Sequence, residues 1–333
     1  MESFVISKTP FRVSFFGGGS DYPYYYRDNP AAVIATSINR YCYIMARYLP
    51  PFFDHKHQIS WSYLETVNDI NDIRHPAVRE VFKFLEVDRG VDIHHAGDLP
   101  ARAGMGTSSA FTVGLLNAMY ALKDIKPSPI NLGLQAIHIE QDLIKEKVGS
   151  QDQITSAVGG FNRINFSFKN NEHDINVTPI KNGKKLEPYL MLFFTGLSRT
   201  ASDIAKTQID RGDKNIVALS RMYQMVGTAE YILECGNILE FGSLLDESWR
   251  LKKTLSPKVS TEYIDFLYAK ALKAGAIGGK VTGAGGGGFL LLFVEPDKQQ
   301  SVKNALDKLL YVPLKFDTRG SQIIYDGRLN SEI

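Results

Sequence analysis

Apolar residues in the first third of the chain recur with the short period of β-strands. Four such stretches are bounded by turn-forming residues, and we predict a strand in each of the ranges 4–16, 32–49, 55–64 and 90–95. Helical spacing appears near 76–86. The range 108–122 is apolar on almost every side, which predicts a helix buried in a core.

The middle of the chain changes from a helical pattern to a polar one. The range 130–147 predicts an amphipathic helix, because its apolar residues gather on one side. The range 168–188 is rich in Asn and Lys and has the composition of a linker, and a new apolar strand follows it. We therefore predict a domain boundary near residue 180, which divides the chain into domains 1–180 and 181–333.

Long helical patterns dominate the second half of the chain, at about 199–250 and 258–274. A glycine-rich turn and the apolar strand 288–294 come after them. Because strands and helices occur in blocks, without a regular alternation of strand and helix, the sequence predicts the α+β class.

Composition and charge exclude several classes of function. The 333 residues carry a net charge of +2, so no bulk attraction to nucleic acid or to a membrane surface is expected. The apolar runs are too short for a membrane span and the N-terminus lacks a secretory pattern, which predicts a cytoplasmic protein. Cys42 and Cys235 stand far apart and outside any CxxC pattern, so neither a disulfide framework nor a zinc site is indicated.

A glycine-rich turn between a predicted strand and the predicted helix 108–122 indicates an anion site. Glycines let successive backbone N–H groups converge and the helix adds its positive end, an arrangement suited to a di- or triphosphate. A simple helix cap would use one hydroxyl and leave the others unexplained. The predicted nucleotide-binding residues are Pro100, Gly104, Met105, Gly106, Thr107, Ser108 and Ser109.

A second glycine cluster follows the first predicted strand. Arg12 lies on that strand, and three consecutive glycines precede a serine and an aspartate. Since glycine readily adopts positive φ and admits close neighbours, the run indicates either a tight turn or a place where a ligand approaches the backbone. The run and the two residues after it are Gly17, Gly18, Gly19, Ser20 and Asp21.

Three stretches of the sequence resemble the motifs of the GHMP kinases, the superfamily of galactokinase, homoserine kinase, mevalonate kinase and phosphomevalonate kinase. The range 100–110 resembles their phosphate loop, 9–22 their first motif and 278–289 their glycine-rich third motif. The resemblance implies an α+β fold with a ribosomal-protein-S5-like N-terminal domain and a ferredoxin-like C-terminal domain. It also implies the use of ATP and Mg²⁺.

The same resemblance implies chemical roles for particular side chains. Asp152, in a predicted turn, would orient or deprotonate the acceptor hydroxyl, and Arg12 would keep Asp152 ionised and offset charge on the moving phosphoryl group. Glu140 would hold Mg²⁺ together with one serine of the phosphate loop. That serine is Ser108 when the loops are aligned from their glycines, and Ser109 when they are aligned from the following alanine.

The glycine run most resembles that of the D-glycero-D-manno-heptose 7-phosphate kinase branch, and after it the fucokinase branch. This implies phosphorylation of the anomeric hydroxyl of a heptose 7-phosphate. The predicted substrate-binding residues on the sugar would then be Gly17, Gly18, Gly19, Ser20, Asp21 and Gly285. Arg199 would bind the phosphate that the sugar already carries.

Two other functions stay open from the sequence. One is a kinase for another small alcohol, of the fucokinase, galactokinase or mevalonate kinase type. The other, from a different class, is a ligand sensor on the same fold that no longer turns over substrate, against which the presence of Arg12, Glu140 and Asp152 argues. The expected partner is a small-molecule sugar phosphate, and the expected assembly is a monomer or a homodimer.

Overall fold

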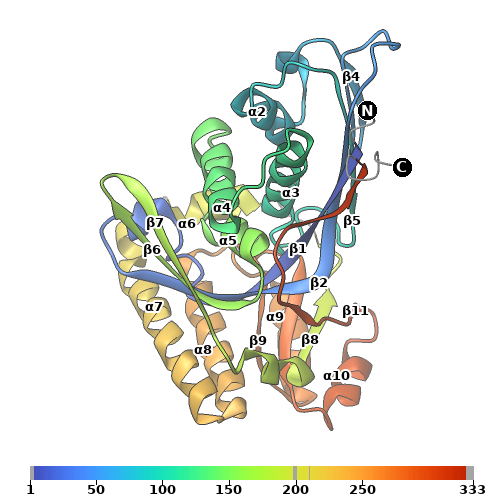
Figure 1. Ribbon diagram of the computed structural model, residues 1–333. Helices are drawn as coiled ribbons and strands as arrows, with labels where there is room; N and C mark the ends of the chain where they lie inside the picture. Colours follow the sequence, from blue (N-terminus) through green and yellow to red (C-terminus); the bar gives the residue numbers. More distant parts are fainter. Residues whose placement is uncertain (1–3, 198–200, 210, 328–333) are drawn as a thin grey trace.

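The largest element of the fold is a nine-stranded sheet (Figure 1). The structure is a computed structural model that describes residues 4–197, 201–209 and 211–327. The strands of this sheet are Phe4–Phe16 (β1), Ala31–Tyr48 (β2), His57–Ser60 (β3), Leu64–Val67 (β4), Val91–Gly97 (β5), Phe161–Lys169 (β6), Glu172–Pro179 (β7), Phe316–Asp317 (β12) and Gln322–Asp326 (β13).

The long strands β1 and β2 form the centre of this sheet. The main order is β13-β1-β2-β5-β3-β4, while β12 and β6 also pair with β2, and β7 pairs with β6. Most neighbours are antiparallel, but β3 is parallel to β5. Because β13 pairs with β1, segments from near both ends of the chain lie side by side (Figure 1).

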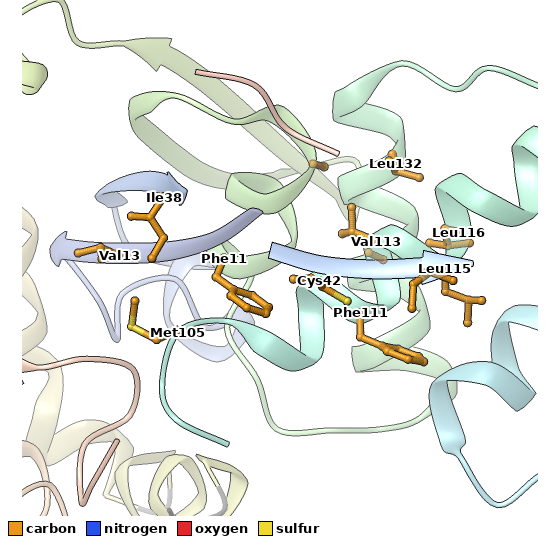
Figure 2. Close-up of a cluster of buried hydrophobic side chains, with 14 of the residues drawn as sticks. Phe11, Val13, Ile38, Cys42, Met105, Phe111, Val113, Leu115, Leu116 and Leu132 are labelled. Atoms are coloured by element: carbon orange, nitrogen blue, oxygen red, sulfur yellow. The ribbon is translucent and has the colours of Figure 1, made fainter. Parts of the chain in front are cut away.

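The first core lies between this sheet and a buried helix. Helix α3 is apolar on nearly all sides, so it is stable only when it is enclosed, and it packs on β1 and β2. Figure 2 shows Phe11 of β1, Cys42 of β2 and Phe111 of α3 in this cluster. The helices of this part are Pro23–Tyr26 (α1), Pro76–Phe84 (α2), Thr107–Leu122 (α3), Pro129–His138 (α4) and Gln151–Val158 (α5), with short helical turns at Ile70–Asp72, Ile139–Leu143 and Gly183–Tyr189.

A second sheet of four antiparallel strands has the order β11-β8-β10-β9. Its strands are Leu190–Phe194 (β8), Ala276–Val281 (β9), Phe289–Val294 (β10) and Leu310–Val312 (β11). All residues of β10 are buried, as its wholly apolar sequence requires. The helices of this part are Ala201–Ile209 (α6), Gly212–Cys235 (α7), Ile238–Leu255 (α8), Glu262–Lys273 (α9) and Gln299–Ala305 (α10).

Helix α8 joins the two parts of the molecule. It packs on β9 of the second sheet and also contacts β1 of the first, and α7 lies beside it (Figure 1). The predicted α+β class is confirmed. In the part of the chain that the structure describes, no helix is both long and apolar enough to cross a membrane.

Several predicted elements differ from the structure. The helix predicted over 130–147 is shorter in the structure. Its regular part is α4, which ends at His138, and a single π-helical turn, Ile139–Leu143, follows. The polar range 168–188 is not a linker, because most of it belongs to the β6–β7 hairpin, whose turn uses positive φ at Asn170 and Asn171. The boundary near 180 stays a prediction, and β12 and β13 return to the first sheet.

Candidate active site

One pocket brings together the segments that the sequence singled out. Its walls come from the end of β1 and the turn after it, the loop before α3, the loop before α5, and the loop between β9 and β10. Helices α6 and α8 add side chains from the second half of the chain. Segments that are up to about 270 residues apart in sequence therefore face a single cavity.

The predicted phosphate loop leads directly into α3. Gly106 is the N-cap of this helix and has a φ of 71°, a left-handed conformation that favours glycine. A Cβ at Gly106 would lie 3.0 Å from Cγ of Arg12 and 3.3 Å from Oδ2 of Asp152. The first backbone N–H groups of a helix have no partner within it, and here Gly106, Thr107 and Ser108 line the pocket. The loop is therefore shaped to hold an anion against its backbone.

Arg12 and Asp152 form a two-point ion pair in the pocket. Nε of Arg12 donates to Oδ1 of Asp152 at 2.6 Å, and Nη2 donates to Oδ2 at 2.8 Å. Nη1 of Arg12 donates to the carbonyl of Gly104 at 2.8 Å, which ties the pair to the phosphate loop. Asp152 lies in the first turn of α5, not in the open turn that we predicted. The paired geometry holds the carboxylate in one orientation beside Gly106.

Asp21 links the glycine turn to the start of α5. Its Oδ1 accepts from the backbone N–H of Gly19 at 2.8 Å, and its Oδ2 accepts from Nε2 of Gln151 at 3.0 Å. Burial raises the pKa of Asp21 above its ordinary value. A Cβ at Gly149 would lie only 2.0 Å from Oδ2 of Asp21, so a larger residue there would displace the carboxylate. Asp21 lines the pocket, but it also holds two turns together.

The three consecutive glycines have different roles. Gly17 has a φ of 78°, and a Cβ there would lie 1.9 Å from the carbonyl oxygen of Ala32. The hydroxyl of Ser20 donates to the carbonyls of Gly17 and Ala32, so Gly17 and Ser20 shape the turn and lie outside the pocket lining, contrary to our expectation. Gly18 and Gly19 do line the pocket.

Glu140 lies in the π-helical turn and is almost fully buried. Its Oε2 accepts from Oγ of Ser109 at 2.9 Å and from Nε2 of Gln153 at 2.5 Å. Its Oε1 is buried and has no hydrogen-bond partner in the described structure. Burial raises the pKa of Glu140 to about 7. The orphaned oxygen and the adjacent hydroxyl fit a hard cation such as Mg²⁺, and the structure favours Ser109 over Ser108 as the neighbouring hydroxyl.

Two family models match this chain. The model of the GHMP kinases N terminal domain matches residues 73–160, and that of the GHMP kinases C terminal region matches 228–312. Together these ranges make up more than half of the 333 residues. The chain belongs to the GHMP kinase superfamily. It is an ATP-dependent phosphotransferase with an alcohol group as acceptor, on the mixed α+β fold of these kinases.

Individual relatives within the GHMP kinases cover nearly the whole chain. A D-glycero-alpha-D-manno-heptose 7-phosphate kinase of Campylobacter jejuni is 29% identical over 91% of this chain and 93% of its own length. A galactokinase of Pyrococcus furiosus is 24% identical over 90% of this chain and 91% of its own. The crystal structure of a D-glycero-D-manno-heptose 1-phosphate kinase from Bacteroides thetaiotaomicron has a TM-score of 0.78 and 25% identity, covering 96% of this chain and 99% of that one.

Two expected nucleotide contacts lie outside the pocket of this GHMP kinase. Met105 is wholly buried in the core beneath the phosphate loop, and only its carbonyl, which accepts from the N–H of Arg12 at 3.0 Å, serves the site. Pro100 is exposed and is not part of the pocket lining. The glycines and hydroxyl residues of the loop thus line the pocket, while the buried Met105 between them fixes the position of the loop.

The third motif of this GHMP kinase also contributes differently from our expectation. A Cβ at Gly285 would lie 2.5 Å from the carbonyl oxygen of Val259, so Gly285 is packed against that segment. Gly285 is not part of the pocket lining, whereas Gly283 and Ala284 are. The Cα of Gly104 lies 2.6 Å from where a Cβ of Gly283 would be, so the third motif packs on the phosphate loop. Arg199 lies outside the described residues.

Several residues of the pocket were not among the site residues that we predicted from the sequence. Gln151 donates to the carboxylate of Asp21, and Gly149 leaves room for it. Both residues stand beside Asp152 in the sequence, and this position could have indicated them. Lys280 lies in the third motif, and this place was its signal in the sequence. Lys252 had no signal, because a lysine in the last turn of an amphipathic helix is usually exposed.

Proposed function

We propose that the protein transfers a phosphoryl group from ATP to the anomeric hydroxyl of D-glycero-D-manno-heptose 7-phosphate. The product would be the 1,7-bisphosphate, in the synthesis of nucleotide-activated heptose. The similarity to a heptose 7-phosphate kinase over 91% of this chain is the observation that supports this substrate. The open floor of the pocket at Gly18 agrees with a large sugar, because a Cβ there would have no atom closer than 3.6 Å.

Asp152 is the group that acts on the acceptor hydroxyl in this proposal. Its carboxylate lies beside Gly106, where the phosphate loop meets α3, so a hydroxyl next to it would also face a phosphate held by the loop. The carboxylate accepts the hydroxyl proton as the new bond forms. Arg12 holds the carboxylate in that orientation, and its positive charge offsets negative charge that develops nearby.

The residues that would hold ATP and Mg²⁺ are grouped around the start of α3. Gly104, Gly106, Thr107 and Ser108 offer backbone and hydroxyl groups to phosphate oxygens. Glu140 and Ser109 offer a carboxylate and a hydroxyl to Mg²⁺. When bound, ATP supplies the phosphoryl group and Mg²⁺ neutralises part of its charge. The use of ATP also agrees with the proposed cytoplasmic location, where this nucleotide is available.

A coupled assay of ATP consumption against a panel of sugars and sugar phosphates tests the proposal. We expect heptose 7-phosphate to give the highest kcat/KM, and phosphorus NMR to show a new phosphate on the anomeric carbon. Faster turnover of free fucose, galactose or mevalonate would assign the protein to another branch of the superfamily. A folded protein that binds a sugar phosphate but consumes no ATP with any acceptor would instead be a sensor.

A further inference from the structure

Two buried lysines reach the pocket from the second half of the chain. Lys252 comes from the last turn of α8, and Lys280 comes from β9. Their exposed fractions are only 5% and 2%, yet both line the pocket. A fully buried ammonium group is costly unless it is matched by hydrogen bonds and by opposite charge.

Among the described side chains, most of the hydrogen-bonding capacity of these two ammonium groups is unused. Nζ of Lys252 donates to the carbonyl of Gly283, and Nζ of Lys280 donates to the carbonyl of Phe15 at 2.9 Å. An ammonium group has three N–H donors, so each lysine keeps two for another partner. Among the side chains that the structure describes, no carboxylate lies within 4.0 Å of either ammonium group.

The charges around the two lysines do not balance. Asp21 and Asp152 partly offset the charge of Lys252, and Asp21 partly offsets that of Lys280. Asp152 is already paired with Arg12, so two carboxylates face three cations. Burial, together with the nearby charge of Arg12, lowers the pKa of Lys252 to about 8. Burial and the nearby charge of Lys252 lower the pKa of Lys280 well below its ordinary value. An anion between the two ammonium groups would relieve this repulsion.

The position of the lysines places such an anion beside the phosphate loop. Gly283, which accepts from Lys252, packs on Gly104 of that loop. Lys280 is held at the end of β1, next to the glycine turn. The two ammonium groups therefore lie between the segments that the proposed function gives to the nucleotide and to the sugar.

We propose that Lys252 and Lys280 together form a site for a phosphate group, with the free N–H donors of both lysines directed to its oxygens. This inference rests on the proposed function for the identity of the ligand. The phosphate group in this site could come from two sources with the same chemistry. One is the phosphoryl group in transfer from ATP, and the other is the phosphate that the sugar already carries.

Calorimetric titration of inorganic phosphate into the protein tests the site itself, without any activity. The variants are Lys252→Met and Lys280→Met, which keep most of the side-chain length and remove the charge. The matched control is Lys253→Met, since Lys253 is next in the chain and pairs with Asp265 away from the pocket. We expect at least a tenfold weaker affinity for phosphate in the first two variants and less than a twofold change in the control.

Two results would overturn the inference. One is an unchanged phosphate affinity in both variants, which would place the bound phosphate elsewhere, for instance in the loop before α3. The other is a wild-type protein that binds no phosphate at millimolar concentration, a result that does not depend on whether the variants fold. A protein that binds phosphate through the lysines but phosphorylates no heptose would keep this inference and refute the proposed function.

A second titration identifies the source of the phosphate. Inorganic phosphate is added to protein saturated with a non-hydrolysable ATP analogue and Mg²⁺. Loss of the lysine-dependent binding assigns the site to the phosphoryl group of ATP, and both variants should then lose kcat on every acceptor. Retained binding assigns it to the phosphate of the sugar, and KM should then rise at least tenfold for heptose 7-phosphate alone.

Discussion

At the scale of single residues, the proposed action on the acceptor hydroxyl depends on the geometry of the Arg12–Asp152 pair. Two parallel hydrogen bonds fix the carboxylate more firmly than a single contact would, because both oxygens are constrained. The third donor of Arg12 reaches the carbonyl of Gly104. A change at Asp152 should therefore affect the chemical step while the nucleotide loop keeps its own support.

Replacing Asp152 by Asn should leave the shape and remove the proton acceptor. We expect kcat to fall by roughly 10²-fold or more, with little change in nucleotide affinity measured by calorimetry. The control is Asp142→Asn, because the exposed Asp142 pairs with His138 outside the pocket. A near-normal kcat in Asp152→Asn would show that orientation alone suffices and that the residue is not the base.

The residues of this site were predictable from the sequence to different degrees. Arg12, Asp152 and Glu140 stand in or near motifs, so their types and order indicated the chemistry before the fold was known. The choice of Ser109 over Ser108 depends on which hydroxyl the first turn of α3 directs towards Glu140, and only the structure shows that. The role of Lys252 could not be predicted from the sequence for a similar reason, because only the folded structure shows that its side chain is buried.

The three glycines offer a direct comparison at this scale. Gly17→Ala should destabilise the protein by about 3 kcal/mol, because it combines a left-handed backbone with a clash against Ala32. Gly18→Ala should change the unfolding free energy by less than about 0.5 kcal/mol, since the new Cβ has ordinary contacts only. Urea denaturation measures both variants, and equal losses would contradict the separate roles.

At the scale of elements, the unit that matters is the loop and first turn of α3. Its glycines leave room for neighbouring residues as well as for a ligand. Gly104 is packed against Thr282, and Gly106 is packed against Arg12. The carbonyl of Met105, which is part of this loop, accepts from the backbone N–H of Arg12 and so attaches the loop to β1. The loop is therefore a preformed element whose shape depends on β1 and on the third motif.

A single methyl group in this loop should disturb nucleotide binding. Gly106→Ala places a Cβ 3.0 Å from Arg12 in a left-handed conformation, so the loop must shift and its N–H groups turn away from phosphate. We expect at least a tenfold loss of ATP affinity by calorimetry with a retained fold. The control is Gly227→Ala in α7, where nothing lies within 4 Å of the new Cβ. Equal ATP affinity in the two variants would locate the phosphate site elsewhere.

Local sequence patterns predicted the existence of elements better than their ends. The apolar residues identified α3 and β1 because most positions of both elements are buried. The β6–β7 hairpin was missed, since β7 is only partly covered and its polar residues have the composition of a loop. The π-helical turn at Glu140 has no periodic signal, because one inserted residue per turn is set by packing and by the site.

At the scale of the whole molecule, the site depends on the contact between the two sheets. Helix α8 touches β1 and β9, and the pocket takes residues from both parts of the chain. That β12 and β13 return to the first sheet could not be predicted, because short, half-exposed strands carry little pattern and their partners are distant in sequence. The three motifs nevertheless indicated that distant segments meet.

The buried carboxylate of Glu140 should make the stability of the whole protein depend on pH. Its pKa is about 7 in the folded state, against an ordinary value of 4.5, so between these values the folded protein keeps a proton that the unfolded chain has released. The unfolding free energy must therefore fall as pH rises through this window, by about 3 kcal/mol in total. Below 4.5 both states are protonated, and the effect is absent.

Urea denaturation at pH 5 and pH 8 without Mg²⁺ measures this loss in the wild type and in Glu140→Gln. The variant cannot ionise, so its unfolding free energy should fall by about 2.5 kcal/mol less than that of the wild type over this range, because pH 5 already lies above the unfolded pKa. The control is Glu234→Gln, because Glu234 is exposed on α7 and should leave the pH dependence unchanged. Adding Mg²⁺ at pH 8 should stabilise the wild type but not Glu140→Gln, since the cation compensates the buried charge. The same pH dependence in all three proteins would show that Glu140 ionises freely and would remove the physical basis for placing Mg²⁺ beside it.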